Sequence, residues 1–280
     1  MVVQVSGPLT LGSDSPRLRF GEAAKPEAAW AGGRLMLVDE NPAYELSFPC
    51  GTCQFLFRRL ACSHDTLSID DLRGRLAHGL DTVDLDVVAS FGQLLGRGTY
   101  LPLLMTVEPR LVAPGEPGDY FAEEEFVTWG AGWYGKAPED PGTSYYRTFE
   151  TRVAPEAHLY EFVVPMLPPA RDDPATLAKY AGLLASSSAP TAVAVSVLDV
   201  CAPAVAPDGT DWYEHWGLTH FLLDGHHKVH AAAEAGQPVQ LLSLLSVDAS
   251  LAAPEQVSRV PELRERPRGG RGSSRPGART

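Results

Sequence analysis

The sequence predicts an α/β (α+β) protein in which a mixed sheet with flanking helices, formed by the C-terminal half, joins a strand-rich N-terminal region. Three observations support this prediction. Residues 191–200 form a nearly all-apolar run rich in β-branched side chains, which is typical of a strand buried on both faces. Asp173-Pro174 opens a helical pattern, because proline is favoured at the first helical position. Residues 218–236 follow the order strand, turn and helix, and Gly236 ends that helix.

The N-terminal half is expected to be rich in strands and loops. Residues 1–48 mix short apolar runs with Gly, Pro and Asp, a pattern that predicts strands and turns. A helix is expected to start near Ser68, which acidic residues follow, and to continue to about residue 80. Residues 99–112 form a long β-like run, and residues 113–143 are rich in Gly, Pro and acids. We therefore expect the latter to form a loop at the rim or lid of a pocket.

The C-terminal half continues with strands over 158–165 and 239–247, and with helices over 174–185 and 229–235. These elements divide the chain into a strand-rich region (1–150) that contains a Cys-x-x-Cys loop and a Gly/Trp-rich loop, an α/β domain (151–250) and a tail (251–280). From Arg264 to the end, the tail holds six arginines among Gly, Ser and Pro, and we expect it to be disordered.

Charge and composition exclude several classes of protein. A net charge of −12 argues against non-specific binding of nucleic acid. No apolar run approaches the roughly 20 residues that span a bilayer, and the N-terminus lacks the pattern of a signal peptide. We therefore expect a cytoplasmic protein that acts on a small molecule, without membrane or nucleic-acid partners. Its oligomeric state is not predicted.

The turn Asp224-Gly225-His226-His227-Lys228 is the strongest candidate site. A buried strand that turns through glycine into a helix presents several backbone N–H groups, and the helix dipole favours an anion beside them. Gly225 allows a phosphate to approach closely, while His226, His227 and Lys228 add hydrogen-bonding or cationic groups. Asp224, His226 and His227 are the candidate catalytic residues. The alternative is an ordinary tight turn with exposed histidines.

The block 173–247 resembles the ParB/sulfiredoxin-like superfamily, whose members often carry Asp-Gly-His-His-Arg before an Ala-rich helix, as residues 224–233 nearly do here. That superfamily includes chromosome-partitioning CTPases, ATP-dependent sulfinic-acid reductases and kinases of free serine, and they bind nucleotides at this turn. The motif is closest to that of the free-serine-kinase-like and ParB-like nuclease members. The resemblance implies a ParB/sulfiredoxin-like fold, with ATP or ADP and Mg²⁺ as cofactors.

The chain departs from the superfamily in three respects. His226 stands where sulfiredoxins have a catalytic cysteine, so sulfinic-acid reduction is not expected. The serine kinases carry a glutamate in the region that matches 165–173, where this chain offers Asp172 or Asp173, with Glu161 further upstream. Partitioning proteins have a DNA-binding domain after the fold, and a short tail follows here, so a partitioning role is not expected.

Cys50, Cys53, Cys62 and His64 form a second candidate cluster. A Cys-x-x-Cys pair followed by Cys-x-His can close a tetrahedral structural Zn²⁺ site. Two alternatives remain open. Cys50 and Cys53 can form a redox-active pair at a helix N-terminus, or the cysteines are small buried apolar residues.

Arg147 is a candidate for binding phosphate, because a planar guanidinium holds phosphate at two points. The acids between 119 and 125 are candidates for Mg²⁺, or else form a solvated loop. Three functions fit these residues. The first is a nucleotide-dependent phosphotransferase acting on a small molecule. The second is a non-catalytic nucleotide- or ligand-binding protein whose N-terminal half contacts a partner, and the third is a metal-dependent nuclease-like enzyme.

Overall fold

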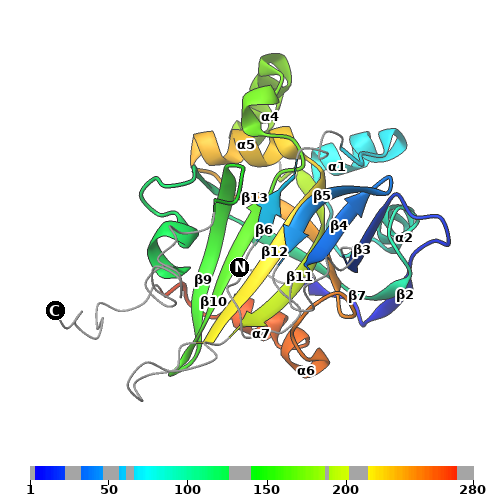
Figure 1. The fold of residues 1–280 in the computed structure, drawn as a ribbon. Coiled ribbons are helices and arrows are strands. Elements are labelled where there is room, and N and C mark those ends of the chain that lie inside the picture. The colour runs from blue at the N-terminus through cyan, green and yellow to red at the C-terminus, as the bar shows by residue number, and fades with distance from the viewer. Residues whose placement is uncertain are drawn as a thin grey trace.

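The computed structural model describes residues 4–22, 33–46, 57–60, 66–125, 140–186, 189–201 and 214–269. These residues form a large mixed sheet, a smaller antiparallel sheet and several helices (Figure 1). The α/β class predicted from the sequence is therefore confirmed.

The large sheet runs in the order β1 (Gln4–Val5), β7 (Gly98–Val107), β13 (Val239–Ser246), β11 (Thr191–Cys201), β12 (Glu214–Asp224), β10 (Ala157–Val164), β9 (Tyr145–Ala154) and β8 (Arg110–Val112), with β2 (Leu9–Leu11) also beside β7. The small sheet contains β3 (Leu18–Glu22), β4 (Arg34–Val38), β5 (Asn41–Leu46) and β6 (Phe57–Arg59). β10 is parallel to β12, and β11 is antiparallel to β12 but parallel to β13. The predicted strands 191–200 and 218–223 thus lie side by side.

The helices are α1 (Arg73–His78), α2 (Leu85–Gly92), α4 (Pro174–Ala185), α5 (His226–Ala235), α6 (Pro254–Val257) and α7 (Val260–Glu265). α4 begins and ends where the sequence predicts: the carboxylate of Asp173 accepts a hydrogen bond from the amide of Thr176, and Pro174 takes the first position. Gly236 ends α5 with a φ of 59°, a conformation that favours glycine. The sequence analysis missed α2, which Asp84 caps.

The large sheet is strongly curled. β7 and β8 stand six strand spacings apart in its order, and a flat sheet would separate them by about 29 Å. However, only Glu108 and Pro109 connect the two strands, and the step from Val107 to Arg110 spans at most about 11 Å. The two flanks of the sheet therefore approach each other at this end of β7, along a line that we call the seam.

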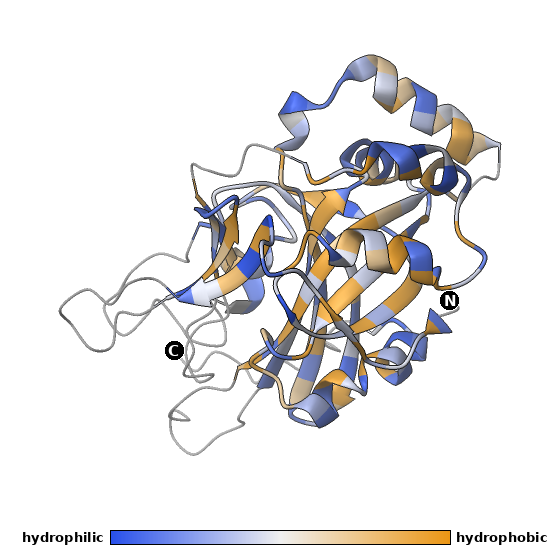
Figure 2. Cartoon of the chain, turned by 90° about the vertical axis from the view of Figure 1, so that its right-hand side faces the viewer, coloured by the Kyte–Doolittle hydropathy of each residue, from blue (hydrophilic) through white to orange (hydrophobic). Residues whose placement is uncertain are grey.

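The two faces of the large sheet carry separate apolar cores. The small sheet, α1 and α2 cover one face, where Tyr44, Phe57 and Phe91 pack against side chains such as Phe162 and Phe221. Helices α4 to α7 cover the other face, where Val229 and Leu263 join a second cluster. Figure 2 shows the apolar strands inside and mixed colouring on the outer helices. Both ends of the described chain thus contribute to one sheet and its two cores.

Two predicted domain limits are corrected. The boundary between 150 and 151 falls inside β9, and the N-terminal strand β7 pairs with β13 along its length, so the large sheet is built from both halves. The predicted disordered tail was also placed too early, because residues 254–265 form α6 and α7. Arg264 is fully buried there and faces the carboxylate of Glu161. Such long-range pairing leaves no local signal in the sequence.

Candidate functional site

The candidate site lies at the edge of the large sheet where the parallel strands β10 and β12 both end. The loop 165–173 follows β10, and the turn 224–228 follows β12. Two hydrogen bonds join them: the amide of Met166 donates to Nε2 of His226, and the amide of Asp173 donates to Nε2 of His227, each at 3.0 Å. Ligands of open α/β sheets commonly bind at this position, outside the carboxyl ends of the strands.

Asp224 and Lys228 form a buried ion pair beneath the turn. The Nζ of Lys228 lies 2.7 Å from Oδ2 of Asp224 and donates to the carbonyl of Thr191 at 2.8 Å. Burial acts to raise the pKa of Asp224, but the charge and hydrogen bond of Lys228 outweigh it and hold the pKa below its ordinary value. Lys228 thus holds the start of β11 against the turn. Because the ammonium of Lys228 is held in this buried pair, the geometry does not favour its direct contact with a phosphate.

Gly225 serves the packing of the turn. Its φ is 94°, and a Cβ at this position would lie 2.7 Å from the Cβ of Ala192 in β11. A side chain is therefore excluded by the neighbouring strand as well as by the backbone conformation. No side chain caps the N-terminus of α5 at this glycine. The N–H groups of the first turn consequently remain oriented toward the strand edge.

The three histidines of α5 play different parts. His226 is buried, and burial lowers its pKa to about 4, so its ring is neutral and supports the loop after β10. His227 is 30% exposed. Since its Nε2 accepts the amide of Asp173, the neutral ring carries its proton on Nδ1 and can donate it to an anion. His230 contacts the buried carboxylate of Asp172, with 2.6 Å between Nδ1 and Oδ2.

Asp172 therefore joins two of these histidines. Its Oδ1 lies 3.6 Å from Nε2 of His227, on the opposite side of the carboxylate from His230. Of the two aspartates offered by the sequence, Asp172 faces α5, whereas Asp173 caps α4 through the amide of Thr176. The structure thus brings Asp172, His227 and His230 together at the start of α5.

Positive charge from three helices acts on this end of α5. Burial lowers the pKa of Lys228, Asp224 acts to raise it, and the charges of Arg73 in α1 and Lys179 in α4 lower it further. The Nζ of Lys228 also lies 5.8 Å from the ring centre of Tyr180 in α4. Because Lys228 pairs with Asp224 and Arg73 pairs with Asp70, the helix dipole and Lys179 are the contributions that favour an anion at this edge.

The other predicted site residues lie elsewhere. Arg147, on β9, makes ion pairs with Glu124 at 2.9 Å and Glu150 at 2.6 Å, so it belongs to a different cluster. Asp119, at the start of the acidic run, is buried and accepts a hydrogen bond from the hydroxyl of Tyr145. Cys50, Cys53, Cys62 and His64 lie outside the described residues.

The sequence analysis missed a buried polar row across the large sheet. Glu161 of β10 faces His220 of β12, with 3.4 Å between Oε1 and Nε2, and Ser196 of β11 contacts Nδ1 of His220 at 2.7 Å. Arg264 of α7 lies over Glu161, with 3.1 Å between Nε and Oε1. Burial alone would raise the pKa of Glu161, but Arg264, His220 and Thr148 lower it to about 2.

This row resembles a Ser-His-Glu triad in composition but not in accessibility. Glu161, Ser196 and His220 are fully buried between the sheet and the helices, so a substrate cannot reach the serine. A catalytic serine also gives its proton to the imidazole nitrogen that it contacts, and its hydroxyl must meet the substrate. We therefore assign the row to the packing of α7. A charged or polar residue inside an apolar strand, as at Glu161 and His220, is the signal that could have revealed it.

Comparison of the chain with protein-family models, with curated proteins and with solved structures finds no match. Within the described ranges, no three His, Cys, Asp or Glu side chains come together in a way that could hold a metal ion. The helices in those ranges include none with the length and apolar character needed to cross a membrane.

Proposed function

We propose that this protein binds a nucleotide or another phosphate-bearing small molecule at the first turn of α5, and that it transfers a phosphoryl group to a small molecule there. One observation carries the proposal. Asp172, from the loop after β10, meets His227 and His230 beside a helix N-terminus that no side chain caps. A carboxylate, an exposed imidazole and a group of main-chain donors are thereby brought to one edge of the sheet.

Binding of phosphate rests on charge and on hydrogen-bond donors. The N–H groups of the first turn carry the positive end of the helix dipole, and Nδ1 of His227 adds a side-chain donor. Lys179 contributes charge from the neighbouring helix α4. The resemblance of residues 224–233 to the ParB/sulfiredoxin-like turn supports the same class of ligand.

Transfer would follow the usual course of phosphoryl chemistry. The hydroxyl of the acceptor forms a new O–P bond, the bond between the terminal phosphorus and the bridging oxygen of the nucleotide breaks, and the hydroxyl proton passes to a base. Asp172 is the carboxylate at this edge, with His230 to orient it. The described residues do not form a protein cage for Mg²⁺. Magnesium commonly reaches such sites bound to the phosphates of its nucleotide.

Ligand binding without catalysis is the second candidate function, and a specific observation favours it. The side chain of Asp172 is 4% exposed, and the polar atoms of Asp224 and Lys228 already have partners within the fold. A buried carboxylate makes a poor base for a substrate unless the loop 165–173 moves. Turnover of nucleotide separates the two functions.

Calorimetric titration with ATP, ADP and CTP in the presence of Mg²⁺ tests the binding site. The native protein should bind at least one of the three below millimolar concentration. Replacing His227 with alanine should weaken binding by about ten- to a hundredfold, the value of a hydrogen bond to a charged group. His78→Ala, at an exposed histidine in α1, is the matched control and should bind like the native protein. Failure of all three nucleotides to bind would refute the proposal.

Release of ADP in the presence of small alcohols and hydroxy amino acids tests the transfer step. If Asp172 accepts the proton, Asp172→Asn should lower turnover by about 10²–10⁴ with little change in affinity. If the native protein binds nucleotide and shows no turnover, the non-catalytic function is correct instead.

A further inference from the structure

We infer that a second ligand site, for a small molecule carrying a carboxylate or phosphate group, lies on the seam of the large sheet beside the C-terminal end of α5. Two cavities, of about 440 Å³ and 260 Å³, adjoin there and share Glu108, Arg110 and Arg268. The larger one is of the size that small-molecule sites commonly have. Neither is lined by Asp172, His227 or His230, so this site is distinct from the one proposed above.

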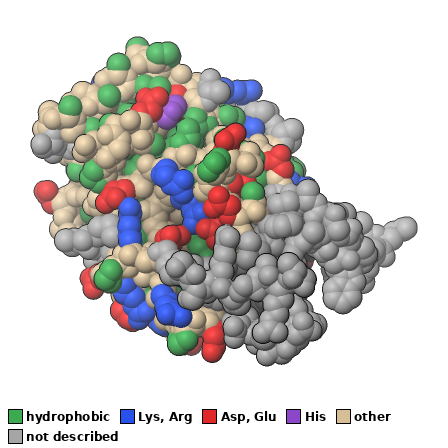
Figure 3. Space-filling view, turned by 90° about the vertical axis from the view of Figure 1, so that its left-hand side faces the viewer, with side chains coloured by type: hydrophobic (Ala, Val, Ile, Leu, Met, Phe, Trp, Pro, Cys, Tyr) green, Lys and Arg blue, Asp and Glu red, His purple; other side chains and the backbone are tan. Residues whose placement is uncertain are grey.

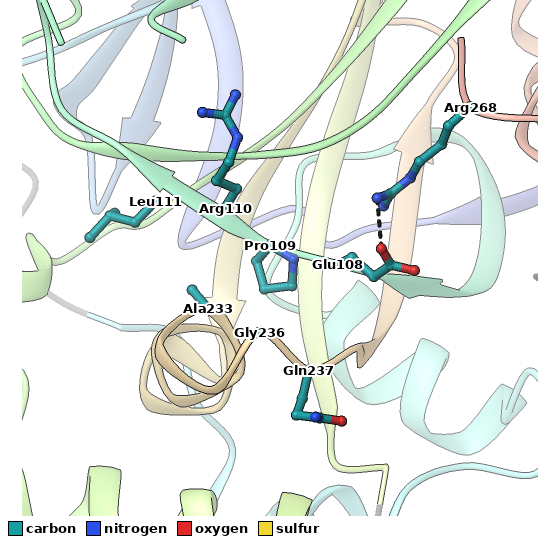
Figure 4. A pocket seen from close by; sticks show the side chains of 8 residues that line it. All are labelled: Glu108, Pro109, Arg110, Leu111, Ala233, Gly236, Gln237 and Arg268. Carbon is teal, nitrogen blue, oxygen red and sulfur yellow. Dashed lines mark hydrogen bonds and ion pairs between the residues drawn. The ribbon is translucent and has the colours of Figure 1, made fainter. Parts of the chain in front are cut away.

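The larger cavity combines apolar walls with charged groups. Pro109 lines it from the connection between β7 and β8, Leu111 lines it from β8, and Ala233 lines it from α5. In Figure 4, Arg110 and Arg268 stand on opposite sides, with Pro109 and Glu108 between them. Such a cavity can hold the body of a small organic molecule on its apolar wall while a guanidinium holds the polar end.

The arginines around the cavities differ in how they are paired with acids. Arg268 pairs with Glu108 at 2.6 Å, and Arg147 lies between Glu124 and Glu150. Arg110 is exposed, and no acid pairs with it among the residues that the structure describes. Basic and acidic side chains stand next to one another on the face beside β9 (Figure 3). An added anion would therefore find its counter-charge at Arg110.

The guanidinium of Arg110 is also held in position before a ligand binds. Arg110 of β8 stands directly opposite Arg147 of β9, whose charge is balanced by Glu124 and Glu150. The guanidinium of Arg110 packs on Gly118, where a Cβ would lie 2.3 Å from Nη1. Arg147 donates to the carbonyl of the same glycine at 3.0 Å. Gly118 thus supports both arginines, and Arg110 needs little reorganisation to bind a ligand.

These features define the class of ligand. A guanidinium binds carboxylate or phosphate through two parallel hydrogen bonds, which an alcohol or amide does not match. The apolar wall formed by Pro109, Leu111 and Ala233 favours an organic body over an inorganic ion. The ligand is therefore a small organic oxyanion.

Calorimetry with three probes tests this inference: phenyl phosphate, benzoate and the neutral benzyl alcohol. At least one of the two anions should bind with a dissociation constant in the millimolar range or below, and benzyl alcohol should bind at least tenfold more weakly. Arg110→Gln should weaken binding of the anion about tenfold or more, and Arg110→Lys should fall between because it keeps the charge and loses the second hydrogen bond. Arg97→Gln, an exposed arginine paired with Asp14, is the matched control and should have no effect.

Three results would overturn the inference: no anion binds, benzyl alcohol binds as well as the anions, or Arg110→Gln binds like the native protein. The variant His227→Ala distinguishes this site from the proposed nucleotide site, and it should bind benzoate, which carries no phosphate, like the native protein. If phenyl phosphate binding is lost in His227→Ala and kept in Arg110→Gln, the probe occupies the start of α5, and the seam site is wrong.

Discussion

Replacing Arg264 with methionine removes the cation that faces Glu161 inside the large sheet. The arginine is fully buried, donates from Nη2 to the carbonyl of Thr106 at 2.8 Å, and lies with Cζ 4.3 Å from the ring centre of Phe149. Methionine retains much of the apolar packing and none of the charge. The loss of stability in Arg264→Met therefore reports mainly on the electrostatic role of Arg264.

The expected magnitude follows from the pKa of Glu161, which falls from 4.5 to about 2 in the fold. A shift of this size corresponds to about 3 kcal/mol of stability. A buried carboxylate left without its partner costs about 3–5 kcal/mol. Arg264→Met should therefore lower the free energy of unfolding by about 3–5 kcal/mol at pH 7. Arg97→Met is the control, because the pair of Arg97 with Asp14 is largely exposed and should contribute less than about 1 kcal/mol.

The difference in stability between the native protein and Arg264→Met should depend on pH in a definite direction. In the native protein the pKa of Glu161 is lowered, so its contribution is complete above pH 4.5 and is lost as the pH falls toward 2. In Arg264→Met, burial without the cation raises the pKa of Glu161 above its unfolded value. Lowering the pH then neutralises the buried carboxylate and reduces the loss of stability. The difference in stability between the two proteins should thus be largest near pH 7 and smaller at pH 3.5.

Urea unfolding followed by circular dichroism at both pH values measures this difference. The double variant Glu161→Gln, Arg264→Met should recover part of the loss, because it removes the unpaired charge. A difference that stays the same at pH 7 and pH 3.5, or a loss below about 1 kcal/mol at pH 7, would refute this account of the buried pair.

Two further predictions concern the turn. Gly225→Val should lower stability by about 2–5 kcal/mol, because it combines a positive φ with a clash against Ala192, and thermal unfolding should show a lowered Tm. Gly74→Ala, at an open position in α1, is the control, and its Tm should stay the same or rise slightly. Lys228→Met should lower the free energy of unfolding by about 3–5 kcal/mol, because it leaves Asp224 buried without its cation. A smaller loss in the double variant Asp224→Asn, Lys228→Met would identify the unpaired charge as the cause.

The sequence predicted those elements whose signals are local. The helix α4 could be placed because Asp173 and Pro174 mark its start, and the end of α5 because Gly236 follows it. Strand β11 could be placed from its unbroken apolar run. The pairing of β7 with β13 joins segments far apart in the chain, and no pattern of neighbouring residues determines which strand a given strand will pair with.

The candidate site was predicted in position and only partly in detail. The motif identified the turn, but not which of its side chains face inward. Asp224 and Lys228, four residues apart, share the inner side and form an ion pair, whereas His227 reaches the surface. This spacing could have been recognised as an ion pair from the sequence. The role of Asp172 could not, because it depends on the path of the loop after β10.

The pairing of β7 with β13 has a consequence for how the protein folds. Leu104 of β7 is opposite Leu242 of β13, so β7 can pair with β13 only after most of the chain is available. Strand pairs between distant segments form slowly, because a long loop must close before any contact stabilises it. During this time the apolar side chains of β7, such as Leu103 and Met105, would be exposed to other molecules. Refolding from denaturant should accordingly be slow and sensitive to protein concentration.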